Sequence, residues 1–180
     1  MKRLFVTVLL VLAMPCLAFG QVLTPQPPKP GPEHQKLGIW VGNWTYEGET
    51  KATPLGPAGK VTGKNTTRPI LGGFFVEFRG EEKGPGGAFE WVEIDGYDPV
   101  AKLFTWNGFQ SDGSVYFVTY TLDGTTMTYS GTLQAGGKLV KIRGTCVFAA
   151  DFNSNVQKTE VSVDGKAWLP SFEGKASKVK

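Results

Sequence analysis

The sequence predicts an all-β fold, an antiparallel up-and-down β-barrel of about eight to ten strands with a short plugging helix at its N-terminus. From Trp44 almost to the C-terminus, short segments of alternating apolar and polar residues follow one another without a long helical segment. Gly-rich or Asp-Gly turns separate them, and such turns accept the positive φ of tight hairpins. A meander this long usually closes on itself, because closure removes the unpaired strand edges.

Residues 1–20 have the pattern of a secretory signal peptide. Lys2-Arg3 is the charged start, residues 4–12 form an apolar run too short to span a bilayer, and Ala18-Phe19-Gly20 places small residues where signal peptidase reads them. We therefore expect an exported protein, periplasmic or secreted, that begins at Gln21. Lipidation is the alternative for Cys16, but Pro15 stands where a lipoprotein signal has a small residue.

Loss of this peptide leaves 160 of the 180 residues, enough for one domain with a sizeable core. It removes two of the 19 basic residues and none of the 16 acidic ones, so the net charge falls from +3 to about +1. No basic block follows, and no second apolar run is long enough to cross a bilayer. The sequence thus predicts no nucleic-acid partner and no transmembrane segment after signal removal.

Residues 21–32 contain five prolines and are interpreted as an extended leader or linker. The single domain, residues 33–180, begins with a helix whose apolar side carries Leu37 and Trp40 and which Gly42 ends. His34 lies near that side. Ten strands are predicted near residues 43–51, 59–70, 73–80, 87–96, 102–110, 114–122, 125–133, 138–149, 155–163 and 171–179.

Five short motifs are arranged in a characteristic order. They are Pro30-Gly31-Pro32-Glu33-His34, Val41-Gly42-Asn43-Trp44, Leu71-Gly72-Gly73-Phe74-Phe75, Gly96-Tyr97-Asp98 and Asp164-Gly165-Lys166-Ala167-Trp168. In this order they resemble a bacterial family of exported proteins, domain-of-unknown-function family 1579. The resemblance implies a lipocalin-like (calycin) barrel and no known activity. Related barrels that bind haem place a histidine on the iron, and His34 precedes the barrel, so no haem or other cofactor is expected.

Catalytic motifs are missing, and we expect a protein that is not an enzyme, with no catalytic or metal-binding residues. A histidine-based triad would have to use His34, which we interpret instead as a polar group at the helix end. A zinc site would have only His34 and Cys146, far apart in sequence. We interpret Cys146 as a buried small apolar residue, the alternative being a nucleophile or an intermolecular bridge.

Two carboxylate pairs could in principle serve glycoside hydrolysis or bind calcium. Glu47 and Glu49 lie two apart on one strand, as do Glu93 and Asp95. A strand's solvent face produces the same spacing, and we favour that interpretation for both pairs.

The favoured function is a non-enzymatic barrel that binds a small apolar or amphipathic molecule. The alternative is an interaction module with a filled barrel and a functional outer face, such as a homodimer interface around Val115 and Phe117. From the alternation, the candidate ligand-binding residues on the inner face are Trp44, Tyr46, Phe74, Val76, Phe78, Phe104, Trp106, Val118, Tyr120, Met127 and Tyr129.

Overall fold

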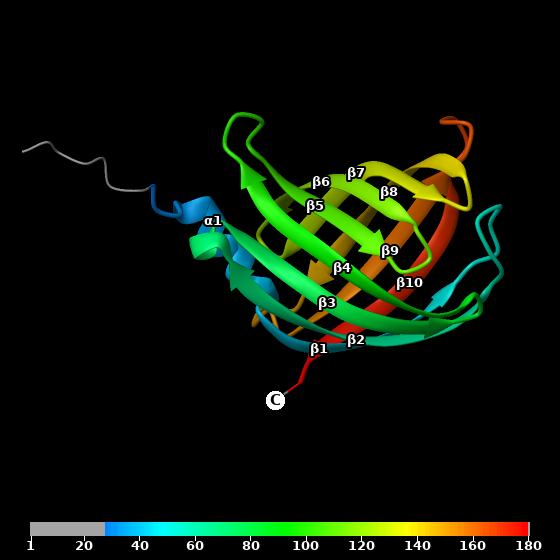
Figure 1. Cartoon of the computed structure of the whole chain (residues 1–180), viewed down its shortest axis with the longest axis horizontal. Coiled ribbons are helices and arrows are strands. Elements are labelled where there is room, and N and C mark those ends of the chain that lie inside the picture. Colours follow the sequence, from blue (N-terminus) through cyan, green and yellow to red (C-terminus); the bar gives the residue numbers. More distant parts are fainter. Residues whose placement is uncertain (1–27, 180) are drawn as a thin grey trace, which may run out of the picture.

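The computed structural model describes residues 28–179 (Figure 1). The predicted signal peptide, residues 1–20, and most of the predicted leader lie outside the described residues. In chain order the elements are α1 (Pro32–Lys36), η1 (Leu37–Trp40), β1 (Gly42–Thr50), β2 (Gly59–Ile70), η2 (Leu71–Gly73), β3 (Phe75–Gly84), β4 (Gly87–Asp98), β5 (Leu103–Gln110), β6 (Val115–Asp123), β7 (Thr126–Ala135), β8 (Lys138–Phe148), β9 (Ser154–Ser162) and β10 (Leu169–Lys178).

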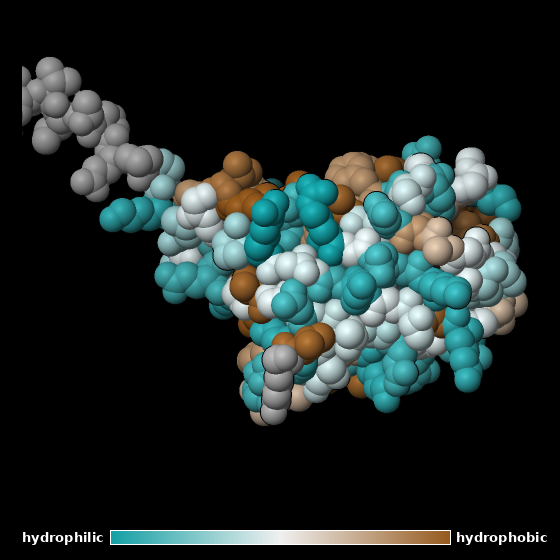
Figure 2. Space-filling model, turned by 60° about the horizontal axis from the view of Figure 1, so that its bottom comes forward, coloured by the Kyte–Doolittle hydropathy of each residue, from teal (hydrophilic) through white to brown (hydrophobic). Residues whose placement is uncertain are grey.

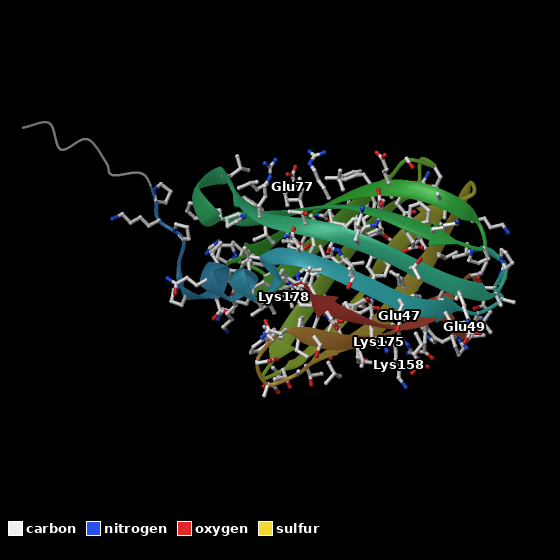
Figure 3. The ribbon with its side chains drawn as sticks, turned by 90° about the horizontal axis from the view of Figure 1, so that it is seen from below. Glu47, Glu49, Glu77, Lys158, Lys175 and Lys178 are labelled. Carbon is white, nitrogen blue, oxygen red and sulfur yellow. The ribbon has the colours of Figure 1, made fainter. Side chains whose placement is uncertain are left out.

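The strands form a closed barrel, as predicted. Each strand pairs antiparallel with the next, and β10 pairs with β1 to complete the circle. Across this closing seam, Glu47 lies opposite Lys175 and bonds it at 2.9 Å (Figure 3). On the neighbouring strand pair, Lys158 of β9 bonds Glu173 of β10 at 3.1 Å. Opposite charges on facing strands favour the pairing, and each of these exposed ion pairs adds only a small stabilisation on the outer surface.

The predicted strand ends differ most from the structure at β3. We predicted residues 73–80, whereas the strand runs from Phe75 to Gly84. The strand starts two residues later than predicted because Gly72 and Gly73, at φ of 72° and 88°, make a turn. Its end is later because the polar residues 81–83 continue to pair with β4 although they no longer show an apolar alternation.

One end of the barrel is covered by α1 and η1 (Figure 1). The predicted single helix is half 3₁₀, since it tightens at Leu37, which is 1% exposed. The Trp40 ring packs edge-on against Phe78 and Phe148. The indole N–H of Trp44 donates to the Trp40 carbonyl oxygen at 2.7 Å, which ties the plug to the first strand.

The outer face is mainly polar. In the view of Figure 2, hydrophilic residues cover most of the surface and apolar ones form small separate groups. Glu47 and Glu49 are exposed and paired with lysines, which confirms their predicted solvent-facing position. Among residues 28–179, no helix combines the length and apolar character that crossing a membrane would need.

Candidate functional site: the interior of the barrel

The barrel encloses a cavity of about 470 Å³. Trp40, at the end of the plug, and Trp44, on β1, line it at the covered end of the barrel. At the other end it reaches the β1–β2 loop, at Leu55 and Pro57, and the β3–β4 turn at Pro85. The cavity therefore has a closed end and a mouth, at opposite ends of the barrel.

Glycines on the inner face keep the barrel hollow. Tyr46 lies directly opposite Gly63, and Trp91 lies opposite Gly80. In each pair a Cβ atom on the glycine would collide with the facing ring. The absent side chain lets the ring lie against the wall instead of pointing to the axis. Two further pairs repeat the arrangement, Tyr116 with Gly108 and Tyr129 with Gly144.

The predicted inner-face residues fall into three groups. Six line the cavity: Trp44, Tyr46, Phe78, Trp106, Val118 and Met127. Four belong to the buried core but do not reach the cavity: Val76, Phe104, Tyr120 and Tyr129. Phe74 is on no strand. It follows η2 and precedes β3, because the turn at Gly72 and Gly73 delays the start of the strand. Its ring packs edge-on against the His34 ring, with 5.0 Å between the ring centres.

His34 is a helix-end group, as we interpreted it. Its Nδ1 atom accepts a hydrogen bond from the Gly31 N–H at 3.2 Å. Cys146 is buried, also as interpreted, and burial raises the pKa of its thiol to about 12. A thiol this hard to ionise behaves as a small apolar residue. The described residues hold no group of three or more potential metal ligands.

Our interpretation of Glu93 and Asp95 as solvent-facing is wrong. Both point into the barrel and line the cavity, and Asp95 is 1% exposed. They share the inner face of β4 with Trp91 and Tyr97, whereas Ile94 lies on the outer side. Glu82 on β3 is a third inward carboxyl that the sequence analysis missed.

Each inward carboxyl group accepts a hydrogen bond from a tyrosine. The Tyr46 hydroxyl donates to Glu82 Oε2 at 2.8 Å, and the Tyr116 hydroxyl donates to Glu93 Oε1. The Tyr120 hydroxyl donates to Asp95 Oδ2 at 3.0 Å. These contacts explain how an otherwise apolar interior holds three carboxyl groups.

Burial favours the neutral form of these acids. It raises the pKa of Glu93 to about 7, although hydrogen bonds from Tyr116 and Trp106 act in the opposite direction. Burial first and the neighbouring Glu93 charge second raise the pKa of Asp95 well above its usual range. Burial also raises the pKa of Glu82. The cavity thus combines aromatic walls with three acids of raised pKa, of which Glu93 titrates near neutral pH.

The sequence matches a family model, and the fold matches solved structures. Residues 29–166 match the model described as "Protein of unknown function (DUF1579)". No curated protein matches the sequence. The crystal structure of Rv2717c from M. tuberculosis is similar with a TM-score of 0.59 at 10% identity, covering 83% of this chain and 99% of that chain.

A second similar structure is the S-type phycobiliprotein lyase CPES from Guillardia theta. Its TM-score is 0.52 at 10% identity, with 82% of this chain and 93% of that chain covered. At such identities these likenesses show the fold alone, a lipocalin-like barrel.

Proposed function

The chain belongs to the DUF1579 family of proteins of unknown function, and we propose that it is an exported, non-enzymatic barrel that binds a small apolar or amphipathic molecule. The observation that carries the proposal is the cavity of about 470 Å³. Small-molecule sites typically measure about 300–1,000 Å³. They are mostly apolar with a few convergent polar groups, which is the composition of this interior.

Binding is favoured over catalysis by the state of the reactive groups. The cavity's thiol, Cys146, has a raised pKa, the reverse of an activated nucleophile. His34 lies outside the barrel and is engaged at the helix end, so it is not adjacent to Cys146 as a base would be.

A second candidate function is an interaction module, with the partner on the outer wall. Phe109 and Phe117 are 45% and 52% exposed, and their rings meet edge-on at 6.3 Å. Phe117, on β6, belongs to the predicted homodimer patch, and Phe109 lies beside it on β5. The alternative as predicted has a filled barrel, and the cavity argues against that part of it. A homodimer formed through the outer face is still compatible with ligand binding inside the barrel.

Dye titration tests the proposal. A panel of hydrophobic dyes should contain at least one saturable ligand with a Kd of about 1 μM, near −8 kcal/mol. Trp106→Ala should weaken that ligand about tenfold or more, because Trp106 lines the cavity. Circular dichroism should show that the variant stays folded.

Trp168→Ala is the matched control. Trp168 lies outside the cavity, with the Arg143 guanidinium 4.1 Å from its ring centre, and its loss should leave the dye affinity unchanged. The binder proposal fails if no dye saturates, or if both tryptophan variants weaken the dye equally.

A further inference from the structure

The cavity is rich in hydrogen-bond acceptors. Glu82, Glu93 and Asp95 lie on one side of it, on the adjacent strands β3 and β4. Their tyrosine partners supply one hydroxyl hydrogen each, whereas an ionised carboxyl group accepts several. Asp95 Oδ1 is buried and has no hydrogen-bond partner within residues 28–179. A buried acceptor without a donor is costly, so this wall is suited to a ligand that donates.

No basic side chain of the described cavity lining neutralises these acids. The lysines there are Lys51 and Lys175, and they bond Glu49 and Glu47 on the outer surface at 2.6 and 2.9 Å. The protein treats its outer wall differently. Glu77, with a side chain 11% exposed, lies between two arginines at 2.8 Å each. The inner acids therefore form a cluster without a counter-ion.

Electron-rich rings lie beside these acids, on β4 itself and on the neighbouring strands β5 and β6. Trp91, Trp106 and Tyr116 all line the same cavity as Glu93. The faces of such rings attract cations, most strongly where water is excluded. An anionic head group, such as a fatty-acid carboxylate, would instead meet the negative faces of the rings, and at a pH at which Glu93 is ionised it would also be repelled by that carboxylate.

We propose that the cavity selects a basic amphiphile, a ligand whose protonated nitrogen binds the Glu93 and Asp95 carboxyl groups while its apolar body lies among the aromatic walls. This inference rests on the proposed function and names the ligand class. The nitrogen supplies both the donor that Asp95 Oδ1 lacks and the positive charge that the acid cluster lacks. If the cavity selects a basic head group, fatty acids should bind most weakly among the members of a ligand panel.

Binding of such a ligand depends on pH in a defined direction. The titratable groups that face Glu93 are Glu82 from β3, Asp95 from its own strand, Tyr46 from β1 and Tyr116 from β6. All of them are acidic or neutral. The pKa of Glu93 is raised to about 7, so its carboxylate becomes available as the pH passes that value. The affinity for a cationic ligand should therefore increase from acidic to mildly alkaline pH.

Three probes with the same apolar body test the head group. They are 2-naphthylmethylamine, 2-naphthalenemethanol and 2-naphthoate, titrated by calorimetry into the chain at a pH of about 6 and about 8. The amine should bind about tenfold or more tightly than the alcohol, and the naphthoate should bind weakest. Only the amine should gain affinity at the higher pH.

Glu93→Gln keeps the size of the side chain and the acceptor for Tyr116 but removes the charge. It should lower amine affinity about tenfold or more at the higher pH and leave alcohol affinity unchanged. Asp95→Asn provides a second, independent variant. Glu81→Gln is the matched control, because Glu81 is an exposed neighbour on β3 that bonds Lys64 at 3.1 Å outside the barrel.

The outcomes separate the two proposals. Preference for the amine, lost in Glu93→Gln or in Asp95→Asn and retained in Glu81→Gln, supports the inference. Equal or tighter binding of the alcohol or the naphthoate overturns the basic-ligand inference and leaves the binding function standing. Failure of all three probes and of the dye panel overturns both.

Discussion

Glu93 is the residue at which the cost of burial and the proposed binding role conflict. Burial raises its pKa to about 7, above the value near 4.5 of an exposed glutamate. A raised carboxyl pKa means that the native state holds its proton more tightly than the unfolded chain does. The associated stability is fully present below about pH 4.5 and is lost as the pH rises through 7. A cavity built only for stability would not keep this acid.

Glu93→Gln should remove the part of the pH dependence that comes from Glu93. Between pH of about 4.5 and about 8, the variant should gain about 1–3 kcal/mol of unfolding free energy relative to the wild type, because it has no carboxyl group to ionise at this buried position. Urea unfolding at the two pH values measures the difference. Glu81→Gln should show no such change. If the difference in unfolding free energy between Glu93→Gln and the wild type is the same at both pH values, the burial assigned to Glu93 is contradicted.

The inward position of Glu93 and Asp95 was only partly readable from the sequence. Phe89, Trp91 and Tyr97 have the same parity as the two acids and mark that face as interior. The other face of the strand is also apolar, so alternation alone did not decide which side was buried. The packed barrel resolves this ambiguity, because pairing with both neighbours fixes the orientation of every side chain on β4.

At the scale of strands, cross-strand pairing of aromatic rings with glycines shapes the cavity. Each inner pair combines a ring on one strand with a glycine directly opposite on the next, as Tyr46 and Gly63 do. A glycine within a strand is a recognised sequence signal of close approach. The sequence thus held part of this information, but the partner of each glycine depended on the register, which only the closed barrel supplies.

Gly63→Ala should destabilise the barrel by about 1–3 kcal/mol. The new methyl group would collide with the Tyr46 ring and with the Glu81 carbonyl oxygen, and it would push the Tyr46 hydroxyl away from Glu82. Urea unfolding measures the loss, and dye titration should show weaker binding because the displaced ring enters the cavity. Gly86→Ala is the control, since a Cβ there meets open space. Equal stability of the two variants would show that the ring does not need the glycine.

The strand order was the most predictable feature of the fold. Asp112-Gly113, Asp123-Gly124 and Asp164-Gly165 mark hairpins, and each of these glycines has a positive φ of 84°, 56° and 73°. Such turns force neighbouring strands to be antiparallel and sequential. The size of the cavity was not predictable, because it depends on how ring orientations and glycine gaps combine across all the strands.

On the scale of the whole molecule, the two ends of the barrel have different roles. The plug of α1 and η1 covers one end, and the described chain enters the fold there (Figure 1). The mouth, at the β1–β2 loop and the β3–β4 turn, lies at the opposite end. The described chain thus begins at the end of the barrel opposite the mouth. Signal removal and ligand binding should therefore be independent.

Export should yield a chain that begins at Gln21, because Ala18 and Gly20 fit the small-residue positions of a signal peptidase site. Intact-mass measurement of the exported protein should show the loss of residues 1–20. Ala18→Arg should block this processing, since a large charged side chain does not fit the site. The processed chain and a chain made without export should bind the same dye with equal affinity, because the described chain begins at the closed end, opposite the mouth. A diacylglyceryl mass on Cys16 would instead identify a lipoprotein anchored to a membrane.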